Sequence, residues 1–240
     1  MTDAARLETT RASYDTVAGH YERLLRNTMD TSPFDRAVLG VFAERVLAAG
    51  GGPVGDLGCG SGRVTTYVDK LGLDAFDIDL SPEMVAVARR THPALRFEVG
   101  SMTRLPLADG TPAGALAWYS TVHTPPHELP QYFREFHRVL VPGGHLLTAF
   151  KVGDECVHLD HAYGHDPSLD VYRVRPEQVS ASLTDAGFEE VARLVRAADE
   201  RVKTPQGYLL ARKPDRVPGR PLTIGRVGSP HEPHAAARRG

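Results

Sequence analysis

Residues 53–63 read Pro-Val-Gly-Asp-Leu-Gly-Cys-Gly-Ser-Gly-Arg, and they predict a strand that passes through a glycine turn into a helix. Residues 54–57 are typical of a buried strand, and glycines follow at 58, 60 and 62 before a helical pattern begins at Val64. Glycine has no Cβ, and a helix N-terminus presents unpaired N–H groups. The stretch is therefore the first half of a βαβ unit, with room for a nucleotide against the turn.

Two common nucleotide motifs are excluded by residues that this stretch lacks. A Gly-x-Gly-x-x-Gly dinucleotide motif would need glycine where Arg63 stands, and a phosphate-binding loop would need Gly-Lys-Ser/Thr. Asp56, just before the turn, would repel phosphate but attract an ammonium or sulfonium group. The next strand, 74–79, ends at Asp79, where a carboxylate is placed to hold two ribose hydroxyls. The predicted ligand is a nucleoside with a cationic tail and no pyrophosphate, and S-adenosylmethionine fits.

Three motifs in register resemble a known family. Residues 56–62 are similar to motif I of the class I S-adenosylmethionine-dependent methyltransferases, and residues 79–84, Asp-Leu-Ser-Pro-Glu-Met, to the second acidic motif. Residues 140–146 resemble the turn that enters the fifth strand. The likeness runs from about Tyr14 to Leu210 and is to small-molecule enzymes of the ubiquinone/menaquinone-biosynthesis type. It implies S-adenosyl-L-methionine as cofactor and S-adenosyl-L-homocysteine as product.

Composition excludes several other classes of protein. Hydrophobic residues make up 41% and charged residues 24% of the 240 residues, as in globular proteins. The formal net charge of −2 is unlike a dedicated nucleic-acid binder, which shows a basic excess. There is no long apolar run or leader signal, so we expect a cytoplasmic protein without membrane contact, either monomer or homodimer. Cys59 and Cys156 are expected to be reduced thiols.

Strands that alternate with helices predict an α/β fold. We expect a Rossmann-like, seven-stranded, mostly parallel sheet with helices on both faces and an antiparallel last strand. Predicted helices cover 10–25, 34–48, 81–90, 128–140 and 176–186. Predicted strands cover 54–57, 74–79, 95–99, 114–120, 144–151, 169–174, 188–195 and 207–213.

The same pattern divides the chain into parts. Residues 1–48 are expected to form a helical cap of the same domain, and 49–213 the S-adenosylmethionine-binding core. Within the core, the polar, histidine-rich segment 153–170 has no clear period and is expected to act as a lid. Residues 214–240 are rich in Pro, Gly, His and Arg and are predicted to be a disordered tail.

The resemblance also implies which residues contact the cofactor. Tyr14 and Tyr21 would cover its methionine part, although tyrosines at these positions could equally pack on the core. Relatives have Asp where Ser101 stands, and serine is the weaker acceptor for the adenine amino group. The full predicted set of cofactor-binding residues is Tyr14, Tyr21, Asp56, Gly58, Cys59, Gly60, Gly62, Asp79, Leu80, Met84, Ser101, Met102, Trp118 and Tyr119.

His123 is the predicted catalytic base. It follows the fourth strand, where the methyl group lies in relatives, and an imidazole suits proton transfer near neutral pH. The alternative is a residue that only lines the pocket. His158, His161 and His165 of the lid are expected at its surface; their spacing matches no metal signature, and we predict no metal.

Three functions remain open. The leading hypothesis is methyl transfer from S-adenosylmethionine to a small-molecule acceptor through O, N or C, with a place in secondary metabolism. The second is a nucleic-acid or protein methyltransferase, although residues 118–121 lack the Asn/Asp-Pro-Pro-Tyr/Phe motif of such enzymes. The third is a non-catalytic cofactor-binding protein. Fold alone does not specify the acceptor.

Overall fold

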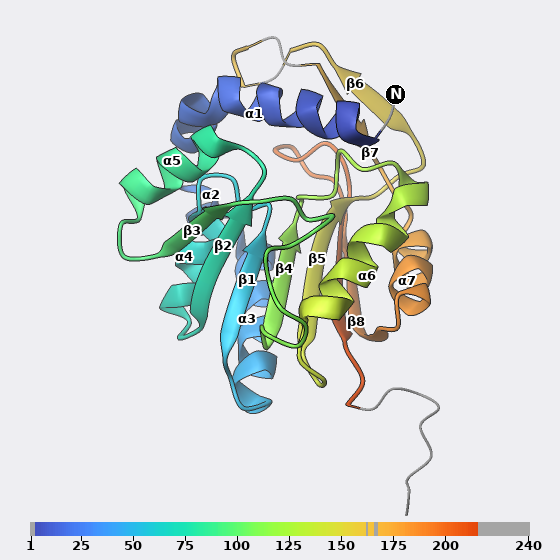
Figure 1. The fold of residues 1–240 in the computed structure, drawn as a ribbon. Coiled ribbons are helices and arrows are strands. Elements are labelled where there is room, and N and C mark those ends of the chain that lie inside the picture. Colours follow the sequence, from blue (N-terminus) through green and yellow to red (C-terminus); the bar gives the residue numbers. More distant parts are fainter. Residues whose placement is uncertain (1–2, 162, 166–167, 216–240) are drawn as a thin grey trace, which may run out of the picture.

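The computed structural model describes residues 3–161, 163–165 and 168–215, and its centre is a seven-stranded sheet (Figure 1). Across the sheet the strand order is β3-β2-β1-β4-β5-β9-β8. The strands are β1 (Pro53–Leu57), β2 (Asp74–Asp79), β3 (Arg96–Val99), β4 (Gly114–Trp118), β5 (His145–Lys151), β8 (Glu189–Arg196) and β9 (Gln206–Arg212).

Strand direction divides the sheet into two parts. The pairs β1–β2, β1–β4, β2–β3 and β4–β5 are all parallel, whereas β9 runs antiparallel to both β5 and β8. Parallel neighbours place Leu57 opposite Ile78 and bring the carboxyl ends of β1, β2 and β4 to one edge. The predicted fold, including the antiparallel last strand, is confirmed.

Helices cover both faces of the sheet, as a parallel sheet requires. One face packs against α6 (Leu129–Val139) and α7 (Pro176–Asp185), and the other against α3 (Pro33–Ala48) and α4 (Arg63–Lys70). Successive residues of β4 alternate between the two cores: Ala115 joins the α6 side and Leu116 the α3 side. This alternation explains why β4 is buried throughout and reads as a continuous apolar run.

The edge where the parallel strands end is covered by α1 (Asp3–Leu25), which crosses above it in Figure 1. Beneath α1 lies α5 (Pro82–Thr91), whose Ser81 cap accepts the Met84 N–H at 3.1 Å. The hairpin of β6 (Cys156–Leu159) and β7 (Leu169–Tyr172) continues over the same edge. Two short elements, α2 (Thr28–Thr31) and η1 (Pro126–Glu128), complete the described chain.

The sequence-based elements differ from the structure in two places. The first helix begins at Asp3, two turns earlier than predicted, and β6 lies in a segment where no strand was predicted. Exposed and half-buried residues alternate along β6, so no run of apolar side chains marks it, and pairing with β7 makes it a strand. The division into cap, core and lid stays a prediction. The predicted tail lies outside the described residues from 216 onward.

Candidate active site

A cleft of about 740 Å³ lies between α1 and the carboxyl ends of the strands. Such sheets bind ligands at this edge, beside the point where the strand order reverses. The cleft has a glycine-turn end, formed by Gly58, Gly60, Asp79 and Ser101, and a His123 end, formed by Arg6, Thr10, Tyr14 and His123. The remaining lining residues are Leu7, Tyr21, Leu80, Gly100, Met102, Trp118, Tyr119, Ser120, Thr124 and Tyr132.

At the glycine-turn end, Asp79 joins the turn to the end of β2. Its Oδ2 accepts the Gly60 N–H at 2.8 Å, and its Oδ1 accepts the Ser81 N–H at 2.8 Å. Burial raises the pKa of the Asp79 carboxyl, although these two donors oppose that shift. Oδ1 keeps a further lone pair, and Oδ2 has only the Cys59 thiol, a weak donor at 4.0 Å, as its second partner, so Asp79 can accept two ribose hydroxyls as the sequence predicts.

The turn can be built only from glycine. Gly58 and Gly60 have φ of 78° and 62°, in the left-handed region that other residues avoid. A Cβ at Gly58 would lie 2.4 Å from Cβ of Ser120, and one at Gly60 would lie 3.3 Å from the Tyr21 ring. The backbone is therefore kept open toward the cleft.

Asp56 does not line the cleft, contrary to the predicted direct contact with a cationic group. Its side chain is 1% exposed and points into a buried cluster in which Thr65 Oγ1 lies 2.8 Å from both Asp56 Oδ2 and Asp77 Oδ2. The Thr65 hydroxyl can donate its proton to only one of these two oxygens. The other carboxyl must therefore be protonated and donate a hydrogen bond to Thr65 Oγ1. Burial accordingly raises the pKa of Asp56 to about 6 and raises that of Asp77 well above its usual value.

Three other predicted contacts also lie outside the cleft lining. Gly62 is the N-cap of α4 with φ of 78°, and a Cβ there would meet the Phe97 ring at 2.7 Å. Met84 is 0% exposed and packs under Tyr14 and Tyr21. Cys59 is half-buried with its Sγ 3.2 Å from the Gly60 carbonyl, and burial raises its pKa. These residues shape the turn and its support rather than the surface of the cleft.

Two polar side chains in the lining lack partners. Among the described residues, neither Ser120 Oγ nor Trp118 Nε1 has a hydrogen-bond partner, although both atoms are buried. Buried polar atoms are nearly always paired, so the Ser120 hydroxyl, whose side chain lies beside Gly58, is available to a bound polar group. The Trp118 ring lines the cleft but also packs against Tyr208 on the α3 side. Ser101, by contrast, shares a 2.8 Å hydrogen bond with Thr103. Unpaired donors beside an open glycine turn fit the polar tail and adenosine of S-adenosylmethionine.

Tyr119, just after β4, has φ of 56°, which is rare for a large side chain. Its ring packs on the α3 side, where its hydroxyl donates to Tyr208 at 3.2 Å and Tyr208 donates to Asp35 at 2.7 Å. Strained backbone of this kind clusters at functional sites. The unusual φ lets the chain turn under the cleft while the phenol is buried away from it.

At the other end, His123 is 9% exposed and has both ring nitrogens occupied. Its Nδ1 lies 2.7 Å from the carbonyl oxygen of Asp170 on β7, and its Nε2 lies 2.9 Å from the Tyr14 hydroxyl. Burial is the main cause that lowers the pKa of His123; the hydrogen bond to the Asp170 backbone and the Asp170 charge oppose this shift, and the charges of Lys151 and Arg6 add to it. The predicted catalytic residue is therefore a neutral imidazole inside the cleft.

Sequence reasoning missed the part of α1 that borders this end. Arg6, Thr10 and Tyr14 are four residues apart and share one helix face. Arg6 is buried and pairs with Glu128 of η1. The four-residue spacing of these side chains could have indicated a shared helix face. The predicted helix began only at Thr10, however, and so excluded Arg6.

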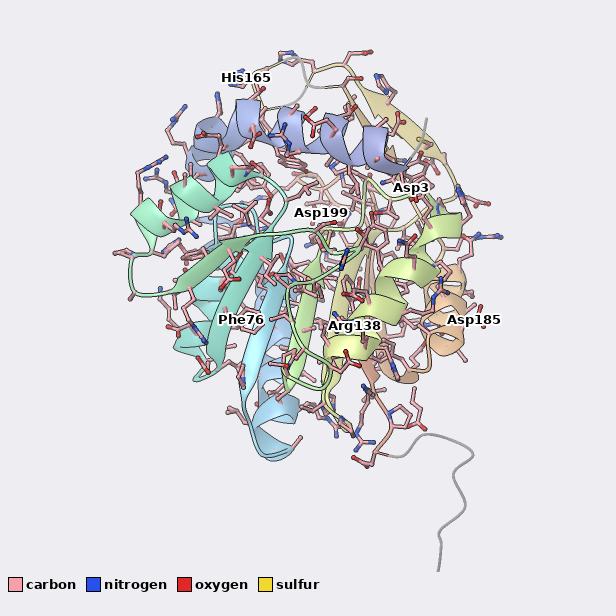
Figure 2. The ribbon with its side chains drawn as sticks, in the orientation of Figure 1. Asp3, Phe76, Arg138, His165, Asp185 and Asp199 are labelled. Atoms are coloured by element: carbon pink, nitrogen blue, oxygen red, sulfur yellow. The ribbon has the colours of Figure 1, made fainter. Side chains whose placement is uncertain are left out.

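The expected lid contributes Tyr163, whose ring lies 5.0 Å from that of Tyr21 and whose φ is 54°. His158 contacts Asp170 at 2.7 Å and Asp160 at 3.2 Å, and these carboxylates raise its pKa. His165 lies on the outer side of α1 in Figure 2, 5.9 Å from the His20 ring. Within the described residues, no three His, Cys, Asp or Glu side chains form a group that could hold a metal.

The comparisons agree with this architecture. Residues 54–144 match the family described as methyltransferase domain. The chain is 36% identical over 90 residues to demethylmenaquinone methyltransferase of Chlorobaculum parvum, covering 37% of this chain and 36% of that protein. It is 33% identical over 129 residues to malonyl-[acyl-carrier protein] O-methyltransferase of Pectobacterium atrosepticum, covering 50% and 48%. The chain thus spans less than half the length of these relatives.

A solved structure shows the same fold. Magnesium protoporphyrin IX methyltransferase of Synechocystis, with S-adenosylmethionine bound, superposes with a TM-score of 0.65 at 15% identity, over 87% of this chain and 97% of that one. In the part of the chain that the structure describes, no helix is long and apolar enough to span a membrane.

Proposed function

We propose that this protein, whose residues 54–144 match the methyltransferase domain family, is a class I S-adenosylmethionine-dependent enzyme that transfers a methyl group to a small-molecule acceptor. The observation that carries the proposal is the cleft itself. At its glycine-turn end, glycines without Cβ atoms lie beside the Asp79 carboxylate. At its His123 end lies a neutral imidazole.

Residues of the glycine-turn end would hold the cofactor. Asp79 would accept the ribose hydroxyls, Ser101 and Met102 would border the adenine, and Ser120 and Trp118 would meet the polar tail. The bound sulfonium supplies an activated methyl group. The chain would supply position and exclusion of water, because α1 covers the cleft on the side away from the sheet and Tyr163 packs against the same cluster as Tyr14 and Tyr21.

The His123 end borders further space inside the molecule that a small acceptor could occupy. A second cavity of about 600 Å³ adjoins it, with Arg6, Thr10 and His123 common to both linings. Its other walls are Thr9, His158, Ser168, Leu169 and Asp170. We propose that the acceptor enters through this cavity, and that residues 1–48 and 153–170 act as the cap and the lid over it.

The cofactor assignment is tested by Asp79→Ala, with binding of S-adenosylhomocysteine measured by titration calorimetry. Loss of hydrogen bonds to a carboxylate should weaken binding by about 2 kcal/mol or more. The matched control is Asp74→Ala at the other end of β2, where the side chain is 62% exposed and pairs with Arg96. Unchanged affinity in a folded Asp79→Ala protein would refute this assignment of Asp79.

A further inference from the structure

We propose that Tyr14 and His123 act as one proton acceptor for a hydroxyl group of the acceptor molecule. The Tyr14 oxygen takes the hydroxyl proton while its own proton passes to Nε2 of His123. This inference rests on the proposed methyl transfer and adds the class of acceptor, a phenol or similar acidic hydroxyl compound. It also replaces direct proton removal by His123 with a two-residue route.

The hydrogen bonds define the tautomer of His123. A carbonyl oxygen can only accept, so the 2.7 Å contact with Asp170 O requires Nδ1 to carry the proton. Nε2 of the neutral ring is then an acceptor, and the Tyr14 hydroxyl at 2.9 Å must donate to it. Backbone of β7 therefore orients the imidazole toward α1 in one protonation state.

This arrangement leaves His123 no free nitrogen for the acceptor molecule. Its single lone pair is already used by Tyr14. The phenol oxygen of Tyr14, which also interacts with the Tyr163 side chain, donates once to His123 and keeps a lone pair that can accept. Tyr14 is half-buried and lines the cleft. The proton that leaves the acceptor molecule therefore moves to the Tyr14 oxygen, and the proton of Tyr14 moves to Nε2 of His123.

The surroundings keep both groups in the required state. The groups that face the pair are Arg6 of α1, Asp79 of β2, Lys151 of β5, Asp170 of β7, and Tyr21 and Tyr163. Burial lowers the pKa of His123, with Lys151 and Arg6 acting in the same direction and Asp170 opposing them, and the net shift below the usual value favours a neutral ring before reaction. Burial also raises the pKa of Tyr14 well above its usual value, so the phenol keeps its proton until Nε2 receives it.

The step balances without any further reagent. The acceptor's O–H bond breaks, its proton moves to the Tyr14 oxygen, and the Tyr14 proton moves to Nε2. The acceptor oxygen bonds to the methyl carbon as the carbon–sulfur bond breaks with its electron pair on sulfur. The products are a methyl ether, a neutral thioether and a His123 imidazolium, which returns its proton to water.

The chemistry of the pair favours a hydroxyl over other acceptors. A neutral amine attacks without a base, a carboxylate is already ionised, and a C–H group donates poorly to a phenol oxygen. A phenolic acceptor has an ordinary pKa near 10, whereas burial raises the pKa of Tyr14, so Tyr14 stays protonated overall and passes the proton of the acceptor on to Nε2. A tyrosine in direct contact with the acceptor is therefore suited to a phenolic hydroxyl.

Nitrogen-15 NMR of the histidine rings tests the pair without any acceptor. His123→Gln identifies the His123 signals, which should show a proton on Nδ1 and none on Nε2 at neutral pH. Tyr14→Phe should keep the proton on Nδ1 but shift the Nε2 resonance, because that atom loses its donor. A proton found on Nε2, or an unmoved Nε2 resonance in Tyr14→Phe, would overturn the proposal.

Turnover tests the acceptor class, with phenol, 4-methoxyphenol, 4-nitrophenol, aniline and benzoate as probes and S-adenosylhomocysteine formation as readout. With the un-ionised phenols, Tyr14→Phe should lower kcat by about 10²–10⁴-fold. It should lower kcat far less for 4-nitrophenol in alkaline buffer, where that acceptor is already ionised. The control Tyr67→Phe changes a half-buried tyrosine of α4 that lies outside the cleft lining.

The outcomes separate the two proposals. Methylation of aniline or benzoate but of none of the phenols would overturn the hydroxyl class, as would equal loss with ionised and un-ionised phenols. No methyl transfer by the unmutated protein to any probe, together with no binding of S-adenosylhomocysteine, would count against the proposed function instead. The imidazole spectrum decides the state of the pair in either case.

Discussion

The two ends of the cleft are assembled from different kinds of sequence. The glycine-turn end comes from residues 53–102, a contiguous piece in which β1, β2 and β3 follow one another through α4 and α5. The His123 end brings together Tyr14 of α1, His123 after β4 and Asp170 of β7, which are 109 and 47 residues apart in the two hydrogen-bonded pairs. A local motif builds the first end, and only tertiary packing builds the second.

This difference predicts that substitutions at one end of the cleft should impair its function without impairing that of the other end. Damage to the glycine turn should remove cofactor binding and leave the Tyr14–His123 hydrogen bond in place. Changes near His123 should alter proton transfer and leave cofactor affinity almost unchanged. Three further predictions test this separation.

The largest effect is expected for Gly60→Val. Its φ of 62° is unfavourable for a β-branched residue, and the new side chain would enter the cleft 3.3 Å from the Tyr21 ring. Backbone strain lowers stability, whereas a branched side chain in the space that the cofactor needs costs roughly 3 kcal/mol of overpacking, so affinity for S-adenosylhomocysteine should fall about 100-fold or more in calorimetry. The control Gly72→Val has φ of 92° but no atoms within 4 Å, and it should lose stability without losing affinity. Tight binding of S-adenosylhomocysteine by folded Gly60→Val would contradict the prediction that the cofactor lies against Gly60.

An intermediate effect is expected for Asp77→Asn in the buried cluster under the turn. Burial raises the pKa of Asp77, so between the ordinary Asp pKa and the raised one the folded state binds more protons than the unfolded state. Stability therefore falls as pH rises through that window, and the loss is complete at higher pH. An amide avoids this penalty and still donates to Thr65 Oγ1.

Urea unfolding at pH 5 and pH 8 measures this change. The free energy of unfolding of Asp77→Asn should exceed that of the unmutated protein by about 1–3 kcal/mol at pH 8 and by less at pH 5. Asp74→Asn, on the same strand but exposed, is the matched control. An equal difference at both pH values would show that Asp77 holds no shared proton.

The smallest effect is expected for Lys151→Met at the His123 end. The Lys151 charge helps to lower the pKa of His123, and only the neutral ring accepts a proton. The acid limb of kcat/KM should lie below the usual histidine pKa near 6.5 and move to higher pH in the variant. Lys70→Met at the end of α4 is the matched control. If the acid limb of kcat/KM does not move in Lys151→Met, the Lys151 charge does not influence the pKa of His123.

Much of the fold followed from short-range patterns. The apolar run of β1, the glycine turn and the Ser81-Pro82 helix start are local, and the structure contains each. The antiparallel pairing of β8 and β9 followed from the short connection between them. The strand β6 was missed because its alternating exposed residues carry little apolar signal, and pairing with β7 supplies the stabilisation.

For the cleft, the sequence by itself determined the glycine turn, Asp79 and the place of His123, because residue type and spacing dictate turns and strand ends. Only the tertiary structure decided that Asp56 shares a buried cluster with Asp77, since strand pairing sets which side chains face each other. It likewise decided that Tyr14 donates to His123 and that Asp170 sets the tautomer. Those contacts depend on how α1 and β7 cross the sheet edge, and no local pattern encodes a distance between segments so far apart in the chain.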